Sequence, residues 1–446
     1  MRFLGIGEYC DLGDMYFGLA AAGHEVRVFV EDPEAQDIFG GMLEFCSDWR
    51  AELSWIRDAG KDGIIVFESS LKGEWQDELR RDGYQVIGGS AYGDRLESDR
   101  DFGQETLREL GLPVAKSHHF TDFEAAIAFV IDTQRRHVFK SNGAGSARTR
   151  NYIGELADGS DMHALLLEHR AHWRAHAADG QTPDFVLMEH IEGVEVGVGA
   201  YFNGMDFLRP ACIDFEHKRL FAGDLGELTG EMGTVVSYRG AERIFDATLG
   251  RMTERLRASG YCGYINLNLI ANDSGLWPLE FTSRFGYPGF AICEALHEES
   301  WDSIFRKMLD PRTDDALHVR TRDGFATGVV LTVPPFPYRY GYNELSKGVP
   351  ILFRAEMKPE DHAALHLAEV AVRDGQLVAS GMMGYIGVAT GVGDSVADAS
   401  AKAYALARKV VTPNMRYRTD IGERVMKHDL ARLQELGYYD RRAGRK

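Results

Sequence analysis

Cysteine is scarce in this chain and follows no pattern. The 446 residues contain five cysteines, an odd number, and no two of them form a C-x-x-C pair. Disulfide frameworks and cysteine-based zinc sites both need several closely spaced cysteines. The sequence therefore argues against both kinds of site and favours a reducing compartment, so we expect a cytoplasmic protein.

Long hydrophobic runs and surplus positive charge are also absent. No apolar run approaches the roughly twenty residues that cross a bilayer, and Glu8 interrupts the short apolar start of the chain, which is not typical of a signal peptide. The formal net charge is −18. A general polyanion binder needs surplus Lys and Arg. We therefore expect no nucleic-acid partner and no membrane partner, and any phosphate site must be local.

The remaining composition is that of a soluble globular protein. Hydrophobic residues make up 44% of the chain and charged residues 26%, which are ordinary values for such proteins. The length is sufficient for roughly three domains, each with its own core. These quantities limit the architecture but identify no function.

Residues 1–95 alternate between apolar strands and helical stretches. The pattern predicts strands at residues 2–7, 25–30, 62–67 and 84–88, and a helix at residues 14–22. This βαβ beginning predicts a small parallel sheet in an α/β domain. Gly5-x-Gly7 is only a weak dinucleotide signal. We expect a tight turn there, although the loop after Gly7 could face a substrate.

The stretch from residue 261 to residue 290 predicts a β-hairpin. Two alternating runs, residues 264–271 and 276–285, flank the turn-rich tetrad Asn-Asp-Ser-Gly. Such a tetrad between alternating runs is typical of a hairpin loop. The other segments are best understood in relation to this hairpin.

One face of the predicted hairpin has the chemistry of a cation site. Side chains alternate across a strand, so Glu280, Thr282 and Arg284 share a face. Asn266 and Asn268 of the paired run could point the same way. Oxygen ligands beside a fixed guanidinium suit Mg²⁺ and the phosphates that it bridges. The alternative is a hairpin with a surface ion pair.

A short strand ends in Lys140 and is followed by a glycine-rich loop. Residues 137–140 read HVFK, and the loop SNGAGSAR then ends in Arg148. Backbone N–H groups, a point charge and a guanidinium fork are the parts that can cover a polyphosphate. The order differs from a Walker A loop, in which the lysine follows the glycines. The alternative is a flexible surface loop with a solvated lysine.

Two strands, predicted at residues 185–190 and 194–202, flank a short linker that contains Ile191. The first strand ends near Glu189 and the second begins near Glu195. This arrangement could place a carboxylate at either end of a nucleoside, with the linker backbone at the adenine edge and Glu195 at the ribose hydroxyls. Charged strand ends are common by chance, so the signal is weak alone.

Other segments complete the chain. Residues 96–110 predict one charged amphipathic helix, ended by Gly111. Residues 223–233 contain four glycines and predict a loop with close backbone approaches, of a length that is more often functional than decorative. From residue 325 a β-rich unit follows, and the tail from residue 431 is charged and helical.

Together these stretches resemble the ATP-grasp fold, and in particular the phosphoribosylamine–glycine ligases of purine biosynthesis, over nearly the whole chain. LESDRDF at residues 96–102 resembles that family's L-E-G-S-K-x-F, with Arg100 in place of its lysine. HVFKSNGAGSAR resembles its strand and glycine-rich loop, with Lys140 and Arg148 at the two basic positions. MEHIEGVEVGV resembles E-E-F-L-x-G-E-E-x-S.

The most specific match covers residues 216–233. It resembles D-H-K-R-x-F-D-G-D-x-G-P-N-T-G-G-M-G over its full length, and the His, Lys, Arg, Gly, Asp, Thr, Met and final Gly recur in register. LEFTSRFGYPG resembles E-F-N-x-R-F-G-D-P-E. YRTDIG at residues 417–422 resembles a motif near the C-terminus of the family.

The resemblance implies a multidomain protein of mixed α/β and α+β class with the ATP-grasp fold. The implied N-terminal part is a parallel α/β (pre-ATP-grasp) domain at residues 1–95. An ATP-grasp domain follows at residues 96–324, with lobes at 96–185 and 186–324. A C-terminal β-rich domain at residues 325–430 and a charged tail at residues 431–446 complete the chain.

The resemblance also implies an activity. An ATP-dependent carboxylate–amine ligase of this type forms an amide through an acylphosphate and releases ADP and phosphate. It needs ATP and Mg²⁺, with Mn²⁺ as an alternative, and small-molecule carboxylate and amine substrates. A monomer or a homodimer is expected.

Roles for individual residues follow from the matched motifs. Phosphates and nucleoside would be held by Arg100, Lys140, Arg148, Glu189, Ile191 and Glu195. Metal ligands would be Asn268, Glu280 and Thr282. The catalytic residues would be Arg284 and Lys218. The amine would be framed by Gly7, Thr229, Gly230, Met232 and Gly233.

The departures from the family pattern lie at the metal and substrate positions. Thr282 replaces the family's metal-binding Asn, Tyr287 and Gly289 replace the two acids of D-P-E, and P-N-T-G-G has become ELTGE at residues 227–231. Two alternatives therefore stay open. One is an ATP-grasp ligase with a divergent acid and amine in a specialised pathway. The other, motivated by the change to Thr282, is a non-catalytic nucleotide-binding relative.

Overall fold

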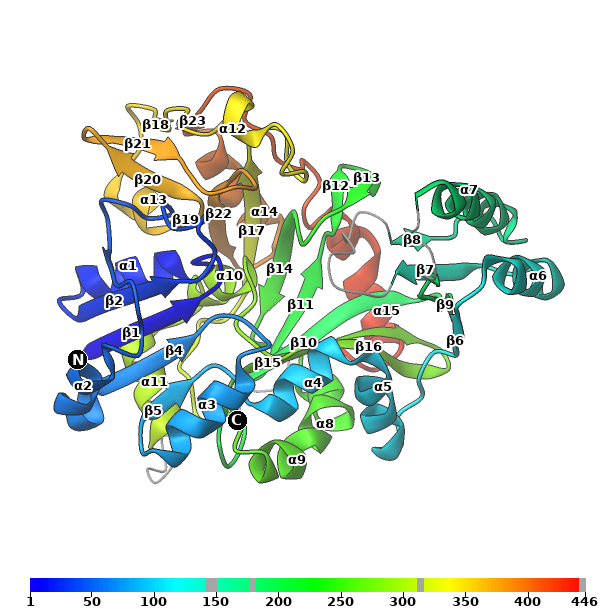
Figure 1. Cartoon of the computed structure of the whole chain (residues 1–446), viewed down its shortest axis with the longest axis horizontal. Helices are drawn as coiled ribbons and strands as arrows, with labels where there is room; N and C mark the ends of the chain where they lie inside the picture. The colour runs from blue at the N-terminus through cyan, green and yellow to red at the C-terminus, as the bar shows by residue number, and fades with distance from the viewer. Residues whose placement is uncertain (142–150, 177–181, 311–316, 441–446) are drawn as a thin grey trace.

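The computed structural model describes residues 1–141, 151–176, 182–310 and 317–440. A parallel sheet lies at the N-terminal end and antiparallel sheets make up the rest, with helices around them (Figure 1). Within these ranges no helix combines the length and the hydrophobicity needed to cross a membrane. The five cysteines, all within the described ranges, are free thiols.

The N-terminal unit confirms the predicted parallel sheet. Its five strands lie in the order β3-β2-β1-β4-β5, and each neighbouring pair is parallel. The central strands are apolar because helices cover both faces of such a sheet. The strands are β1 (Arg2–Gly7), β2 (Glu25–Val30), β3 (Glu44–Phe45), β4 (Gly63–Phe67) and β5 (Gln85–Ile87), and the helices are α1 (Gly13–Ala21), α2 (Leu53–Asp58), η1 (Gly60–Asp62) and α3 (Gly73–Arg81).

The predicted single helix over residues 96–110 is wrong, because the structure has two helices there. α4 (Ala91–Ser98) and α5 (Arg100–Glu109) meet at Asp99, whose backbone is extended. The Asp99 side chain accepts a hydrogen bond from the N–H of Phe102 and so caps α5. An aspartate in this position starts a helix rather than continuing one. As a result Arg100 lies in the first turn of α5.

A four-stranded sheet follows, in the order β6-β9-β7-β8. The helices α6 and α7 lie beside it at the right of Figure 1. Its strands are β6 (Ser117–Phe120), β7 (His137–Ser141), β8 (Tyr152–Ile153) and β9 (Phe185–Glu189), and its helices are α6 (Phe123–Thr133) and α7 (Ser160–His176). The apolar faces of both helices enclose a small separate core around Phe139 and Phe185.

The largest sheet has eight strands in the order β16-β15-β10-β11-β14-β17-β22-β19. It is antiparallel throughout. Its strands are β10 (Val194–Asn203), β11 (Cys212–Glu216), β14 (Gly233–Ser237), β15 (Cys262–Asn272), β16 (Gly275–Thr282), β17 (Phe325–Thr332), β19 (Leu365–Leu367) and β22 (Tyr385–Gly393). Strand pairing thus continues from the central part of the chain into its C-terminal part without a break.

The predicted hairpin is confirmed as β15 and β16. Asn268 lies opposite Glu280 and Asn266 lies opposite Thr282. The second run is shorter than predicted, because β16 ends at Thr282. Arg284 therefore follows the strand instead of extending its alternating face.

The glycine-rich stretch at residues 223–233 was predicted as a loop, and this is wrong in part. Residues 219–228 form a two-stranded hairpin of β12 (Arg219–Phe221) and β13 (Leu225–Leu228). Gly223 and Gly226 have positive φ angles of 75° and 81°, which glycine adopts at little cost. The glycines therefore shape a tight hairpin rather than an irregular loop.

The remaining elements pack around these sheets. Two further strand pairs are β18 (Leu352–Phe353) with β23 (Val410–Val411) and β20 (Val370–Arg373) with β21 (Gln376–Ala379). The helices are α8 (Glu242–Ala247), η3 (Leu249–Met252), α9 (Thr253–Ala258), α10 (Gly289–Glu294), α11 (Trp301–Leu309), α12 (Tyr342–Leu345), α13 (Pro359–Ala363), α14 (Val396–Ala407), the π-helical turn η5 (Val425–Asp429) and α15 (Leu430–Glu435).

Candidate active site

A row of polar residues crosses one face of the eight-stranded sheet. Glu280 on β16 lies opposite Asn268 on β15, which lies opposite Gly197 on β10, which lies opposite Asp214 on β11. A Cβ atom on Gly197 would lie 2.1 Å from Oδ1 of Asp214. Only glycine leaves room for that carboxylate, so the backbone here is shaped around polar side chains.

Lys218 lies at the centre of this face. Its Nζ atom is 2.8 Å from Oε1 of Glu195, 3.2 Å from Oε2 of Glu216 and 3.9 Å from Oε1 of Glu280. Burial alone lowers the pKa of Lys218, but the three carboxylates outweigh it and raise that pKa well above its ordinary value. Lys218 is therefore a permanent cation that holds several acids together.

Two more cations lie near Glu280, one from the four-stranded sheet and one from α5. Nζ of Lys140, at the end of β7, lies 3.5 Å from Oε2 of Glu280. Burial lowers the pKa of Lys140 while Glu280 raises it. Arg100 is also near, since burial lowers its pKa and the Glu280 charge acts in the opposite direction. Arg148, the second basic residue of the predicted phosphate loop, lies outside the described residues.

The oxygen donors around Glu280 fit a hard divalent cation. The Glu280 side chain remains 51% exposed, so its carboxylate can be reached. The amide of Asn268 donates a hydrogen bond of 3.3 Å to Oε2 of Glu216, which brings a second carboxylate beside the pair. Oxygen ligands of this kind are those that Mg²⁺ and Mn²⁺ prefer. Thr282 lies two residues further along the same two strands, opposite Asn266.

The junction between the two sheets contains the residues predicted to hold the nucleoside. β9 belongs to the four-stranded sheet and β10 to the eight-stranded sheet. Glu189 ends β9, and its Oε1 atom is 3.2 Å from Nη1 of Arg135. Ile191 packs on a small cluster that includes Met188. Glu195 is the second residue of β10 and bonds Lys218. The structure thus brings Glu195 into the centre and leaves Glu189 at a rim.

Arg284 lies between α4 and the loop after β1. Its Nε atom donates a hydrogen bond of 3.1 Å to Oε1 of Glu97, and the backbone N–H of Ser283 donates one of 2.8 Å to Oε2 of the same carboxylate. Burial raises the pKa of Asp11, and the nearby Arg284 charge offsets only part of that rise. Arg284 therefore lies close to the loop after β1 as well as to the strand that carries Glu280.

The loop after Gly7 is crowded with acids. A Cβ atom at Gly7 would lie 2.2 Å from Oε2 of Glu68, so glycine is needed to admit this carboxylate. The N–H of Asp11 donates a hydrogen bond of 2.8 Å to the same Oε2 atom. Burial, followed by the charge of Asp11, raises the pKa of Glu68 to about 8. Burial likewise raises the pKa of Glu369 nearby to about 7.

Four of the five residues predicted to frame the amine lie at the base of the β12–β13 hairpin. The N–H and the hydroxyl of Thr229 both donate hydrogen bonds of 2.8 Å to the backbone oxygen of Lys218. Met232 is fully buried beside Leu220, and Gly233 begins β14 with Gly230 just before it. These contacts support the hairpin, so contact with an amine stays a prediction for all four.

Sequence reasoning missed several members of the site. Glu216 begins the family-like motif at residues 216–233, but its bonds to Lys218 and Asn268 depend on strand register, which the motif does not give. Glu97 lies in the family-like motif at residues 96–102, but its partner Arg284 is 187 residues away in the sequence. Glu231, where the family motif has glycine, is 7% exposed and accepts a hydrogen bond from the hydroxyl of Thr234. The glycine-to-acid change was the available signal for Glu231.

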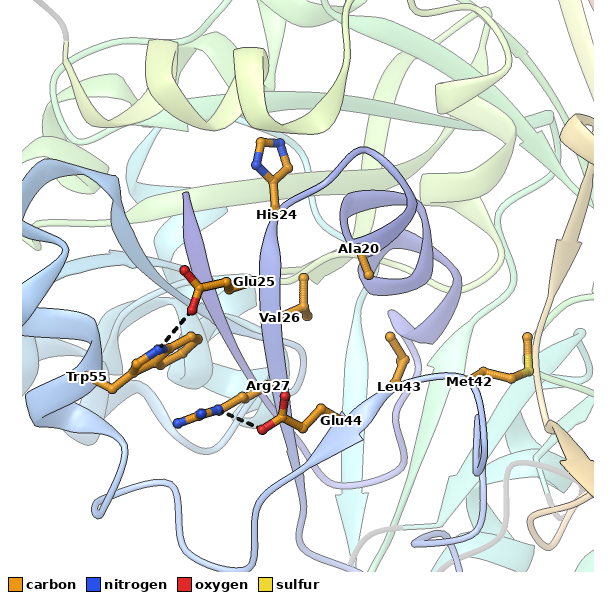
Figure 2. A pocket seen from close by; sticks show the side chains of 9 residues that line it. All are labelled: Ala20, His24, Glu25, Val26, Arg27, Met42, Leu43, Glu44 and Trp55. Carbon is orange, nitrogen blue, oxygen red and sulfur yellow. Dashed lines mark hydrogen bonds and ion pairs between the residues drawn. The ribbon is translucent and has the colours of Figure 1, made fainter.

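A shallow recess on the N-terminal unit lies apart from these residues. Figure 2 shows its lining, in which Trp55 donates to Glu25 and Arg27 pairs with Glu44. The Arg27 guanidinium also lies 4.4 Å from the centre of the Trp55 ring. None of the predicted site residues lines this recess. Its charges are already paired, so it offers no second candidate site.

The two sheets, with the cations of one lobe directed at the carboxylates of the other, are the arrangement of an ATP-grasp protein. Residues 98–290 match the family model described as the phosphoribosylglycinamide synthetase ATP-grasp (A) domain. The chain has the ATP-grasp fold, and its sequence resembles the phosphoribosylamine–glycine ligases in particular.

Relatives from several bacteria support this resemblance. The phosphoribosylamine–glycine ligase of Pseudomonas aeruginosa is 28% identical over 372 residues, which cover 81% of this chain and 83% of that protein. That of Neisseria meningitidis is 24% identical over 438 residues, which cover 96% and 100%. The crystal structure of the ligase from Thermotoga maritima has a TM-score of 0.69 at 22% identity and covers 94% of this chain and all of that one. At that identity the structural likeness shows the fold alone.

Proposed function

We propose that this protein is an ATP-dependent carboxylate–amine ligase of the phosphoribosylamine–glycine ligase type, which forms an amide through an acylphosphate and releases ADP and phosphate. The observation that supports it best is the convergence of Lys140 and Lys218 on Glu280 between the two lobes. The family match over residues 98–290 agrees with it.

The ion pairs around Glu280 suit an exchange of partners. Without nucleotide, Glu280 neutralises both lysines. When ATP binds, the polyphosphate can take over Lys140, with Arg100 near it, which frees the Glu280 carboxylate for a metal ion. Because each charge is paired before and after, the site avoids the cost of leaving a buried charge alone.

The chemistry needs little beyond positioning and charge neutralisation. Mg²⁺ or Mn²⁺, when bound, neutralises phosphate charge. Glu280 with Asn268 or Thr282 would hold that ion, and Glu195 would bind the ribose hydroxyls. Arg284, oriented by Glu97, would clamp the acid or the transferring phosphoryl group through its fork of donors.

The position of Lys218 suits it to hold the carboxylates of the site in place. Its ammonium group lies among carboxylates of β10, β11 and β16. It can therefore keep Glu195 and Glu280 at the spacing that the nucleoside and the metal require. It can also stabilise negative charge that develops on the acylphosphate.

A screen of ADP release tests this function. The purified protein, with Mg²⁺ and ATP, is incubated with single carboxylic acids and amino acids, with and without freshly generated phosphoribosylamine or other amines. ADP release that requires both an acid and an amine supports the ligase. Tight ATP binding without release under any combination would instead indicate the non-catalytic relative.

A second candidate is a ligase for a different acid and amine. It is favoured by Glu231, which adds a buried carboxyl where the family motif has glycine, and by Tyr287 and Gly289, which replace two family acids. In either case the substrates are a small-molecule carboxylate and a small-molecule amine. A cytoplasmic monomer or homodimer remains part of the proposal.

A further inference from the structure

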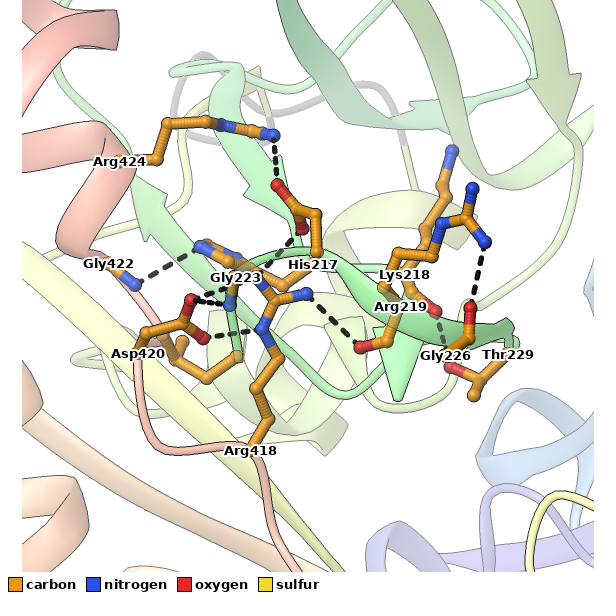
Figure 3. Close-up of polar contacts among 12 residues, drawn as sticks. His217, Lys218, Arg219, Gly223, Gly226, Thr229, Arg418, Asp420, Gly422 and Arg424 are labelled. Atoms are coloured by element: carbon orange, nitrogen blue, oxygen red, sulfur yellow. Dashed lines mark hydrogen bonds and ion pairs between the residues drawn. The ribbon is translucent and has the colours of Figure 1, made fainter. Parts of the chain in front are cut away.

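A segment near the C-terminus wraps over the hairpin that precedes Thr229. We call residues 417–424 the strap and residues 217–232 the Lys218 hairpin. The guanidinium of Arg418, whose side chain is 2% exposed, bonds Oδ1 of Asp420 at 2.5 Å and Oδ1 of Asp224 at 2.8 Å (Figure 3). It also donates a hydrogen bond of 3.1 Å to the backbone oxygen of Arg219.

Two further bonds run from the strap to the hairpin backbone and base. The N–H of Gly223, in the hairpin turn, donates a hydrogen bond of 2.8 Å to Oδ2 of Asp420. The N–H of Gly422 donates one of 3.2 Å to Nε2 of His217. The strap therefore holds the hairpin at its tip, along its first strand and at its base.

His217 is in the protonation state that this contact requires. It is 2% exposed, and burial, followed by the charges of Arg418 and Arg424, lowers its pKa to about 4. Asp420 and Asp224 act in the opposite direction but do not outweigh these effects. The ring is neutral near pH 7, so Nε2 keeps a lone pair for the N–H of Gly422.

The strap is itself anchored on the C-terminal unit. The hydroxyl of Tyr404 on α14 donates a hydrogen bond of 2.9 Å to the backbone oxygen of Arg418 and accepts one of 2.8 Å from the N–H of Ile421. The hairpin tip has less support of its own, because Phe221 and Leu225 are 53% and 65% exposed. The tip is therefore held mainly by polar bonds to the strap.

The hairpin leads directly to the centre of the candidate site. Thr229 bonds the backbone oxygen of Lys218 twice, and the N–H of Met232 donates a hydrogen bond of 2.8 Å to the backbone oxygen of His217. The backbone of Lys218 is thus determined by the hairpin, while its ammonium group lies between Glu195 and Glu280.

We propose that the strap is a positioning element of the active site: Arg418, Asp420 and Gly422 clamp the hairpin and thereby hold Lys218 at its carboxylates. The catalytic consequence rests on the proposed function, whereas the physical link between strap and hairpin does not. Arg418 is a positioning residue, since it acts through Lys218.

Hydrogen exchange of the protein without nucleotide tests the physical link. In Arg418→Met, the amides of Thr229 and Met232 should exchange about tenfold faster or more, because the variant removes the charged donor that joins Asp420, Asp224 and the hairpin backbone. Amides of β15 should not change. Lys409→Met is the matched control, because it removes an ion pair of 2.6 Å with Asp361 elsewhere in the C-terminal unit.

A gentler variant covers the case in which Arg418→Met does not fold. Asp420→Asn keeps the size of the side chain but weakens its bonds to Arg418 and Gly223, and it should accelerate the same amides. Arg418→Lys keeps the charge without the fork, so its exchange rates should lie between wild type and Met. Unchanged exchange at Thr229 and Met232 in folded Arg418→Met or Asp420→Asn would overturn the clamp.

A double-mutant cycle tests the positioning of Lys218. Arg418→Met should lower kcat/KM about tenfold in the wild-type background and less than about twofold in a Lys218→Met background, because residues that act through one another are not additive. Equal effects in both backgrounds would overturn the positioning role, even with the clamp intact. Absence of ADP release in the wild type would count against the proposed function, and the exchange data would still judge the clamp.

Discussion

The two halves of the candidate site differ in the charge that they present. In the nucleotide half, Lys140 and Lys218 converge on Glu280 from opposite lobes. In the half formed by the loop after β1, Glu68 is buried against Asp11 and its pKa is raised to about 8. The first half pairs lysines with an accessible carboxylate, and the second is rich in acids.

The arginines that approach the acidic half already have partners. Arg284 bonds Glu97, and the Arg339 guanidinium lies 5.5 Å from the centre of the Tyr9 ring. A phosphate group bound there would have to displace these partners. Because burial raises the pKa of Glu68 to about 8, that acid keeps its proton near pH 7. The two halves therefore differ in kind: one presents ion pairs, and the other presents a buried acid that can donate a hydrogen bond.

The largest expected effect comes from breaking the nucleotide half. Glu280→Gln should abolish measurable turnover while leaving the fold intact, because it removes the carboxylate on which both lysines and the metal depend. Steady-state ADP release and a thermal melt measure the two outcomes. Glu254→Gln is the control, since that carboxylate is 80% exposed and pairs only with Arg257 in the described ranges. Full activity of Glu280→Gln at low Mg²⁺ would contradict the assignment.

The next effect sharpens the comparison through the substrate. The protein should be a poor phosphoribosylamine–glycine ligase, because Tyr287, Gly289 and Leu228 each replace a polar family residue and each lost partner costs about 1–3 kcal/mol. The measurement is kcat/KM for glycine with freshly generated phosphoribosylamine. A value of about 10⁴ M⁻¹s⁻¹ or more, ordinary for an efficient enzyme, would restore the family's own reaction.

A smaller effect is expected at the phosphates. Lys140→Ala should weaken binding of ATP with Mg²⁺ by about 1.5–3 kcal/mol, the range for a charged hydrogen bond. Titration calorimetry measures the affinity. Lys402→Ala is the control, because Lys402 pairs with Asp398 on α14 and lies away from the site. Unchanged affinity in Lys140→Ala would remove this lysine from the proposal.

The smallest effect concerns pH and the acidic half. The pKa of Glu68 is raised from 4.5 to about 8, so folding retains a proton that the unfolded chain loses. Its contribution to stability is complete below about pH 4.5 and declines as pH rises toward 8. Glu68→Gln should therefore lose less stability than the wild type between pH 5 and 8. Urea unfolding at several pH values measures this, and parallel curves would refute the buried, protonated acid.

Local patterns predicted much of the fold. The alternating runs around Asn-Asp-Ser-Gly predicted β15 and β16 because strand period and turn chemistry agree there. The break at Asp99 was missed because an aspartate within an amphipathic pattern can be either a surface residue or a cap. The β12–β13 hairpin was missed because its strands are short and Gly223 and Gly226 interrupt their periodicity.

The site was predictable only in part, for a physical reason. Lys140, Lys218 and Glu280 carry local signals, and the structure brings them together. Their mutual distances depend on strand register between elements far apart in sequence. Glu97 with Arg284, and Arg418 with Asp224, are pairs of this kind, separated by 187 and 194 residues. No spacing in the sequence reveals such partners.

The unbroken eight-stranded sheet limits how parts of this protein can be exchanged with those of relatives. A chimaera joined at residue 325 would cut between β14 and β17, which are hydrogen-bonded neighbours. In such a chimaera the ladder between β14 and β17 would have to form between strands of different origin. A joint in residues 190–193, between the two sheets, leaves every ladder whole. Recombination can therefore replace the lobe that contains Lys140 more readily than it can replace the C-terminal unit.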